Sequence, residues 1–101
     1  MATTTKALSR AAATTNTGTT LYTVPSATTT VVTNILVANT AGSTSTVTLS
    51  LGGVVAIPTV SIAANTVALF DMKQVLTATQ TITGGASTTA VNIHISGIEV
   101  S

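Results

Sequence analysis

The residues of this chain that could do chemistry are few. His94 is the only imidazole, and Asp71 and Glu99 are the only carboxylic acid side chains in 101 residues that contain no cysteine. Nucleophilic catalysis needs a nucleophile, a base within hydrogen-bonding distance and usually an orienting acid. A triad would require all of these titratable groups to converge on one site, and a hydrolase is therefore a remote alternative. We predict that the chain is not an enzyme and has no catalytic residues.

A metal or cofactor site lacks the residues that it would need. Zinc takes three or four His, Cys or carboxylate ligands, and His94, Asp71 and Glu99 are the whole supply in this chain. One possibility that remains open is a metal on an oligomer axis, to which each subunit donates His94. The alternative is a histidine that is solvated or lies in an interface. Phosphate-binding loops place glycines before a helix N-terminus, whereas Gly52-Gly53 and Gly84-Gly85 are predicted to be turns between strands. We expect no metal, no cofactor and no small-molecule substrate.

Charge is nearly absent from the chain. Charged residues make up 5% of it and the net charge is +1, where about a quarter of an ordinary soluble domain is charged. Three basic residues cannot form the cluster that displaces counterions from nucleic-acid phosphates, so nucleic acid is not an expected partner. Threonine, which is neutral and β-branched, supplies most of the polar surface. Other proteins can cover such a surface without desolvating ions, and this predicts an assembly module.

Hydropathy gives no sign of a membrane segment. The longest apolar runs, such as 35–38 and 54–57, are far shorter than the ~20 residues that span a bilayer. Ser9 and Arg10 interrupt the apolar stretch near the N-terminus, so no signal peptide is predicted. We expect no membrane partner.

Residues 1–17 differ from the rest and are predicted to form an N-terminal arm. The hydroxyl of Thr5 is placed to cap one or two helical turns that end at Ala13, and a helix this short is marginal alone. Two interpretations remain, an arm that becomes ordered on a neighbouring subunit and a solvated tail. The candidate contact residues of the arm are Lys6, Leu8 and Arg10.

Residues 18–101 show short apolar segments separated by turn residues, which is typical of a β-sandwich. Pro58 marks an edge or a strand end, 84–87 is a loop, and Gly97 is a β-bulge, because the apolar positions change parity after it. We predict an all-β fold, an antiparallel two-sheet sandwich of jelly-roll or immunoglobulin-like topology. The predicted strands are 19–24, 29–39, 46–51, 54–57, 67–72, 75–83 and a last one from Val91 onward. In this last strand Ile93 and Ile95 are predicted to point inward and His94 outward. After Gly97, Ile98 and Val100 are the apolar residues that are predicted to face inward.

Alternating threonines suggest one further possibility. Thr77, Thr79, Thr81 and Thr83 would form a ladder of hydroxyls and methyls on one strand face, as in ice-binding proteins. Such ladders repeat across several strands, and this chain has no fixed internal period. The ladder therefore stays a minor alternative.

Several segments resemble small virion structural proteins of tailed bacteriophages. They are Leu21-Tyr22-Thr23-Val24-Pro25, the stretch Thr28 to Thr40, and the closing Ile95-Ser96-Gly97-Ile98-Glu99-Val100. Within that group the chain, over about residues 19–101, is most similar to capsid decoration or cement proteins. The resemblance implies a trimeric β-sandwich on the outside of the head that locks neighbouring capsomers together, with no catalytic residues.

The leading expectation is therefore a cement protein that binds the major capsid protein at the outer capsid surface of the virion. It would act as a homotrimer, since several linked copies bind with a high effective concentration. The alternative is a tail or fibre-associated module, because the Leu-Tyr-Thr-Val-Pro opening also occurs in such proteins. That module would bind a host surface or another tail protein.

Overall fold

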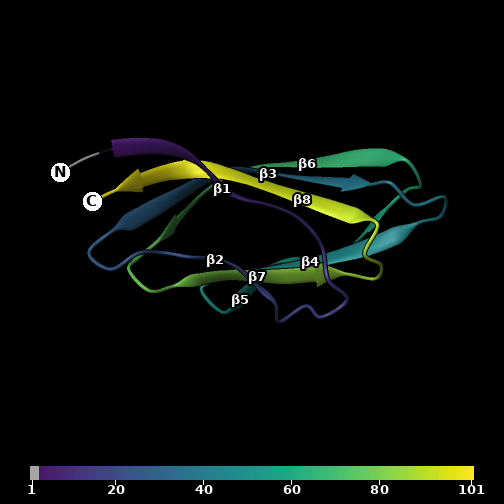
Figure 1. Cartoon of the computed structure of the whole chain (residues 1–101), viewed down its shortest axis with the longest axis horizontal. Helices are drawn as coiled ribbons and strands as arrows, with labels where there is room; N and C mark the ends of the chain where they lie inside the picture. The colour runs from purple at the N-terminus through teal and green to yellow at the C-terminus, as the bar shows by residue number, and fades with distance from the viewer. Residues whose placement is uncertain (1–2) are drawn as a thin grey trace.

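The computed structural model describes residues 3–101, and all regular structure in that range is β-strand. The chain forms two four-stranded antiparallel sheets that pack face to face in an elongated sandwich of 45 × 21 × 18 Å (Figure 1). This confirms the predicted all-β, two-sheet fold. The strands are β1 (Thr3–Ala12), β2 (Thr20–Thr23), β3 (Thr29–Asn39), β4 (Ser45–Leu51), β5 (Val54–Ile62), β6 (Thr66–Leu76), β7 (Thr81–Ala86) and β8 (Val91–Val100).

The strand order identifies the topology. Sheet A has the order β1-β8-β3-β6 and sheet B has the order β2-β7-β4-β5. The pairs β1–β8, β2–β7, β3–β6 and β4–β5 are all antiparallel. The chain is thus one long hairpin of four strand pairs, rolled up so that successive pairs fall in opposite sheets. This arrangement is the jelly roll, one of the two topologies that the sequence left open.

The core lies between the sheets and consists almost entirely of aliphatic side chains. In β3, alternate residues are buried on either side of an irregularity at Thr33, and Ile35 and Val37 are fully buried. In β4, Val47 and Leu49 point inward as their alternation with threonine predicts. Facing positions on the other strands complete this cluster, with Ile82 on β7 and Ile93 and Ile95 on β8.

The N-terminal segment is not a free arm in this structure, and the expected helical turns are wrong. Residues 3–12 form β1, which pairs with β8 along its whole length and shifts register at Leu8. That shift turns the Leu8 side chain into the core, where it is 8% exposed, and Ala13 is 2% exposed. Pairing satisfies the backbone groups of β8 that would otherwise form an open sheet edge. Residues 1–2 of the predicted arm lie outside the described residues.

The predicted strand 75–83 is wrong, and so is the predicted loop at 84–87. Residues 77–80 form a turn in which the Gln80 N–H donates to the Thr77 carbonyl at 3.1 Å, and Thr79 has a φ of 69°. The alternating threonines therefore do not form a ladder on one strand. Strand β7 instead includes Gly84 and Gly85, because other backbone segments lie against them: a Cβ on Gly84 would meet the Thr48 carbonyl oxygen at 2.6 Å. One on Gly85 would lie 2.7 Å from the Asn16 carbonyl oxygen.

The expected bulge at Gly97 lies on the neighbouring strands instead. Strand β8 keeps its alternation through Gly97, while the extra residues are Leu8 in β1 and Thr33 in β3. Gly97 is required because a Cβ there would contact the Val31 carbonyl oxygen and would lie 2.8 Å from the Leu8 side chain. The prediction that Ile98 would take the inward role is therefore wrong.

Two strands are longer than expected. Strand β5 continues past Pro58 to Ile62, and β6 extends from Thr66 to Leu76. Pro58 lies on an edge strand, as predicted, since β5 has a partner only on the β4 side. The turn at Gly52-Gly53 is also confirmed, with φ angles of 60° and 83°.

Candidate interaction surface

The titratable residues do not form one site. His94 pairs with Arg10 on the outer face of sheet A, whereas the alternation of β8 turns Glu99 toward the interior. Asp71 is exposed on β6, on the far side of β3 from His94. Within residues 3–101, no three His, Cys, Asp or Glu side chains gather in a way that could hold a metal ion.

Glu99 belongs to a polar cluster that the sequence analysis missed. Tyr22 on β2 donates a hydrogen bond to the Glu99 carboxylate, and the Tyr22 oxygen lies 2.9 Å from the Thr30 hydroxyl on β3. Lys6 on β1 forms an ion pair with Glu99 at 3.4 Å. We call Lys6, Tyr22, Thr30 and Glu99 the inter-sheet cluster, because it joins β2 of sheet B to three strands of sheet A.

The inter-sheet cluster changes the acidity of two of its members. The hydrogen bond from Tyr22, supported by the positive charge of Lys6, holds the pKa of Glu99 below its usual range. Burial, followed by the hydrogen bond to the Glu99 carboxylate, raises the pKa of Tyr22 above 10. One sequence signal pointed to this cluster: uninterrupted alternation from Ile93 and Ile95 places Glu99 on the inward face. The arrangement joins the two sheets at one end of the sandwich.

All five charged residues of the chain lie on sheet A. Lys6 and Arg10 are on one edge strand, Asp71 and Lys73 are on the other, and Glu99 is on β8. Sheet B therefore carries no charged side chain. Its outer face presents hydroxyls instead, with Thr20, Thr83 and Ser50 side by side on three adjacent strands.

The outer face of sheet A has a polar half and an apolar half. Over β1 and β8 it carries Arg10, His94 and Asn92, which line a shallow recess of about 250 Å³. Over β3 and β6 it carries cross-strand pairs of apolar residues, among them Leu36 with Leu69. The other apolar pairs on this half are Val31 with Val75 and Ala38 with Val67.

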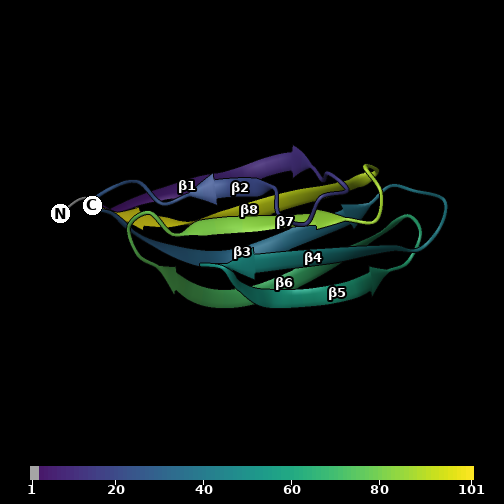
Figure 2. The same ribbon diagram turned by 90° about the horizontal axis from the view of Figure 1, so that it is seen from below.

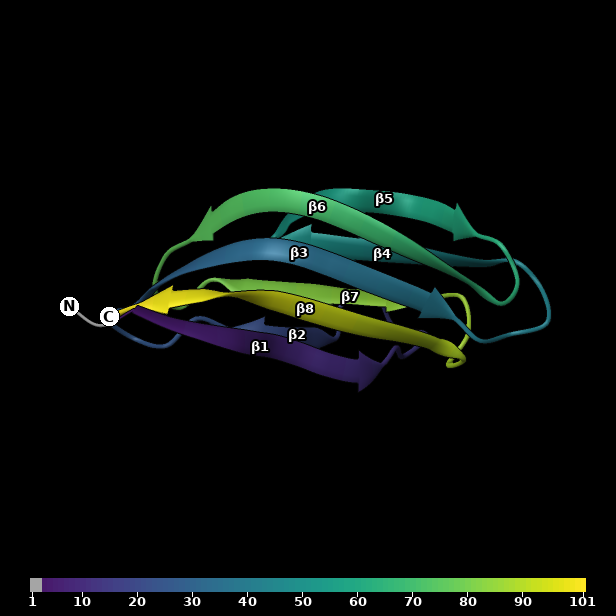
Figure 3. The same cartoon turned by 90° about the horizontal axis from the view of Figure 1, so that it is seen from above.

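The exposed large apolar side chains gather on one side of the sandwich. Among the described side chains, those in this class all lie on β5 and β6, which are edge strands on the same side of the molecule (Figures 2 and 3). These side chains do not form one continuous patch, because Val67, Leu69 and Val75 face outward from sheet A, whereas Val54 and Val55 lie at the β4–β5 hairpin of sheet B. Exposed apolar residues concentrated along one side of a domain favour an interaction site there. We call it the β5–β6 surface; its members are Val54 (71% exposed), Val55 (55%), Val67 (59%), Leu69 (62%) and Val75 (62%).

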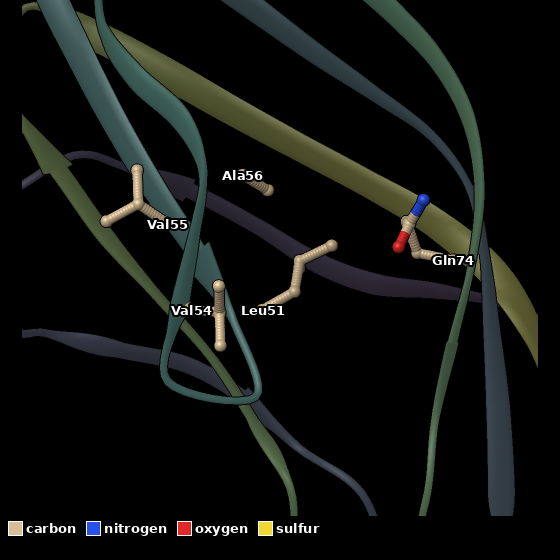
Figure 4. A pocket seen from close by; sticks show the side chains of 5 residues that line it. All are labelled: Leu51, Val54, Val55, Ala56 and Gln74. Carbon is tan, nitrogen blue, oxygen red and sulfur yellow. The ribbon is translucent and has the colours of Figure 1, made fainter.

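A recess of about 330 Å³ opens on the β5–β6 surface. Leu51, Val54, Val55 and Ala56 of the β4–β5 hairpin form one wall, and Gln74 of β6 lies across from them (Figure 4). The wall is apolar and Gln74 supplies the only polar side chain among the lining residues. The recess therefore offers an apolar wall and one amide that can donate or accept a hydrogen bond.

The three candidate arm residues have different environments. Leu8 is part of the core, and Lys6 is engaged in the ion pair with Glu99. Arg10 is exposed on the outer face, beside His94. The register shift at Leu8 explains the difference, because it places residues four apart on opposite faces of the strand. Of the three, Arg10 alone remains exposed without an ion-pair partner among the described residues.

Sequence comparisons leave the family of the chain open. No helix in residues 3–101 is long and apolar enough to cross a membrane. The chain matches no protein-family model, and no curated protein is significantly similar to it.

Proposed function

We propose that this chain is a structural protein of a virion, and specifically a capsid cement protein that binds the outer surface of a tailed-phage head. The observation that carries the proposal is the β5–β6 surface, where Val54, Leu69 and their neighbours are exposed on two adjacent edges. A lone soluble domain would leave this area in contact with water, and covering it by another protein is favourable by about 25 cal/mol per Å² of apolar surface. The narrower assignment to a phage head rests on the resemblance of residues 19–101 to decoration proteins.

Two further properties support an assembly role. The outer face of sheet B carries no charge and is polar over β2, β7 and β4, with the exposed Val55 of β5 beside Ser50, so a neighbouring protein can cover it without removing water from ions. The jelly roll is also a fold of viral capsid proteins, although lectins and cupins share it, so the fold supports the proposal without distinguishing it from sugar binding.

The partners of the proposed cement protein are the major capsid protein and further copies of the chain. The resemblance implies a homotrimer, in which three linked copies would bind the shell with high avidity. Arg10 is retained as a candidate contact to the shell, because it is exposed. Lys6 and Leu8 are engaged within the fold and contribute to docking only by holding β1 in place.

The experiment is a binding assay with empty, expanded heads of the phage that encodes the chain. Purified protein is expected to sediment with the heads and to raise the temperature at which they rupture. Val54→Asn and Leu69→Asn should each weaken binding, because each places an amide in an apolar interface. The matched control is Thr81→Asn on the outer face of sheet B, which should bind like the parent.

Two results would contradict this proposal. If the protein has no affinity for heads but adheres to host cells or tails, the tail or fibre-associated module is correct instead. If the chain binds heads with equal affinity after both apolar substitutions, the β5–β6 surface is not the docking site. Counting copies per virion by quantitative mass spectrometry separates the two assignments independently, since cement proteins occur in far larger numbers than fibre proteins.

A further inference from the structure

We infer that β6 pairs with β6 of a second copy of this chain, so that two copies of sheet A join across a twofold axis at position 72. The sandwich has four free edges, which are β1 and β6 in sheet A and β2 and β5 in sheet B. A free edge presents unpaired N–H and C=O groups to other strands. Length, backbone regularity and charge decide which of these edges can pair with the same strand of a second copy.

Three of the edges are poorly suited to self-pairing. Strand β2 is only four residues long. Strand β5 contains Pro58, which has no N–H to donate, and Thr59 with a φ of 41°. Strand β1 carries Lys6 and Arg10 and no acid, so a second copy of it could place no acid opposite either base.

Strand β6 has a different character. It spans eleven residues and its outer face presents Leu69 and Val75, each 62% exposed. The alternation that places these two side chains outward also places Asp71 and Lys73 there, between them. The edge therefore carries one acid and one base, flanked on each side by an apolar residue.

The geometry of antiparallel pairing restricts the register. A twofold axis between two antiparallel strands passes midway between residues that lie directly opposite each other, so it relates a residue to its own copy. An axis at 71 or 73 would place like charges opposite each other. An axis at 72 places Asp71 opposite Lys73 of the second copy, and Lys73 opposite its Asp71. The same axis places Leu69 opposite Val75, so the charges and the apolar residues match in a single register.

The resulting contact would make one continuous eight-stranded sheet, with the order β1-β8-β3-β6-β6-β3-β8-β1, and sheets of that size are common. It would also cover part of the β5–β6 surface. The contact has twofold symmetry, so a monomer would become a dimer and a trimer would become a pair of trimers. It needs only copies of this chain and is therefore tested without heads, but it occupies Leu69, which also belongs to the surface proposed to bind a phage head.

One feature opposes the contact and sharpens its test. Strand β6 shifts register against β3 between Asp71 and Gln74, and a bulge that twists an edge is one way in which proteins prevent strand pairing. If this irregularity dominates, the chain will not associate through β6 at all.

The test uses charge reversal on the full chain, with mass measured by light scattering during gel filtration. Asp71→Lys and Lys73→Asp should each replace two attractive pairs by two repulsive ones and weaken the association at least about tenfold, equivalent to about 1.4 kcal/mol. A mixture of the two single variants should associate again, because the Lys-only strand then faces the Asp-only strand. The double variant Asp71→Lys/Lys73→Asp should behave like the parent. Arg10→Asp, which changes the net charge as much as Lys73→Asp does, should leave the mass unchanged.

A cross-linking experiment tests the register itself. The chain has no cysteine, so Leu69→Cys and Val75→Cys introduce single reactive thiols. Mixing these two variants should yield a disulfide-linked pair, because directly opposite Cβ atoms lie about 4.5–5.5 Å apart. Neither variant should cross-link with itself.

The outcomes are decisive in either direction. A chain that stays monomeric at about 100 μM would overturn the inference, and so would a complex with an odd number of subunits. A complex that keeps its mass in both single charge variants would do the same. Sedimentation with heads is measured separately, so failure of the β6 contact is distinguishable from failure of head binding.

Discussion

The inter-sheet cluster allows a precise prediction for Tyr22→Phe. This substitution keeps the aromatic ring in place but removes the hydroxyl, which donates to Glu99 and lies 2.9 Å from the hydroxyl of Thr30. Thr30 is fully buried, and the Glu99 side chain is 14% exposed. A hydrogen bond to a charged group contributes about 1.5–3 kcal/mol, so the free energy of unfolding should fall by about 2 kcal/mol at pH 7. With a urea dependence of about 1–2 kcal/mol per M for a chain of this size, the midpoint should fall by about 1–2 M.

The dependence of this loss on pH follows from the lowered pKa of Glu99. A carboxyl group whose pKa is lower in the folded than in the unfolded chain stabilises the fold fully above its unfolded value of about 4.3. That contribution disappears as the pH falls through the folded-state pKa. In Tyr22→Phe the pKa of Glu99 returns toward its usual value, so the difference between parent and variant should be constant above about pH 5 and should shrink below pH 4.

Urea unfolding followed by far-ultraviolet circular dichroism at pH 7 and pH 3 measures both effects. Glu99→Gln is the matched variant, because it keeps an acceptor for Tyr22 but removes the charge. It should show a smaller loss at pH 7, and in its background Tyr22→Phe should cost the same at both pH values. A Tyr22→Phe variant as stable as the parent at pH 7, or equally destabilised at both pH values, would refute the reasoning.

Three other predictions follow from the buried positions. Tyr22 is the only tyrosine, so the ultraviolet absorbance of the phenolate reports on it alone; its midpoint should lie above pH 10 and should move down in Glu99→Gln, which removes one cause of the raised pKa. Gly84→Ala should cost about 1–3 kcal/mol in urea unfolding, because the new methyl group would lie 2.6 Å from the Thr48 carbonyl oxygen. Gly42→Ala is its control: nothing lies within 4 Å of that position, and its stability should change by less than about 0.5 kcal/mol. Leu8→Ala should cost about 2–3 kcal/mol, whereas a free N-terminal arm would show no loss in thermal melting.

Local pattern was sufficient for two of the inner strands. Strand β3 has the bounds that were predicted, Thr29–Asn39, and β4 begins one residue earlier than predicted. In β4, the alternation of aliphatic residues with Thr or Ser records which face is buried, whereas β3 is apolar on both faces in its middle and is recognisable from its length and its β-branched residues. The turn at Gly52-Gly53 was also evident, because both glycines adopt positive φ angles that other residues avoid.

The errors arose where the decisive contact comes from a distant part of the chain. Gly84 and Gly85 look like a turn, and only the approach of Thr48 and of Asn16 explains why they lie inside a strand. Strand β1 contains a single large apolar residue, and its register shift at Leu8 disrupts any period that a sequence could show. Paired residues of β1 and β8 are 80 to 97 positions apart in sequence, so no local signal could identify the partner strand.

The sequence indicated that the chain has a surface for other proteins, but it did not indicate which residues form that surface. The shortage of charge indicated a surface that other proteins cover, yet nothing in the sequence around the exposed apolar residues of β5 and β6 separates them from core residues. What exposes Val67 and Leu69 is the position of β6 at the end of sheet A, with no strand or layer over its outer face. Edge position is a property of the topology, and the sequence left the topology open.

The pairing of β1 with β8 determines the order in which the chain can complete its fold. The first and last strands lie side by side, and both ends of the chain lie at the same end of the sandwich (Figure 1). During synthesis, residues 3–12 have no partner until residues 91–100 have left the ribosome, so sheet A closes last. Contacts this distant in sequence make folding slow, and in that interval Leu8 remains in contact with water. A chain that stalls before residue 91 would therefore keep β1 unpaired and part of its core open to water. Exposed apolar surface and unpaired strand edges promote aggregation, so the addition of β8 is the folding step that protects the protein from it.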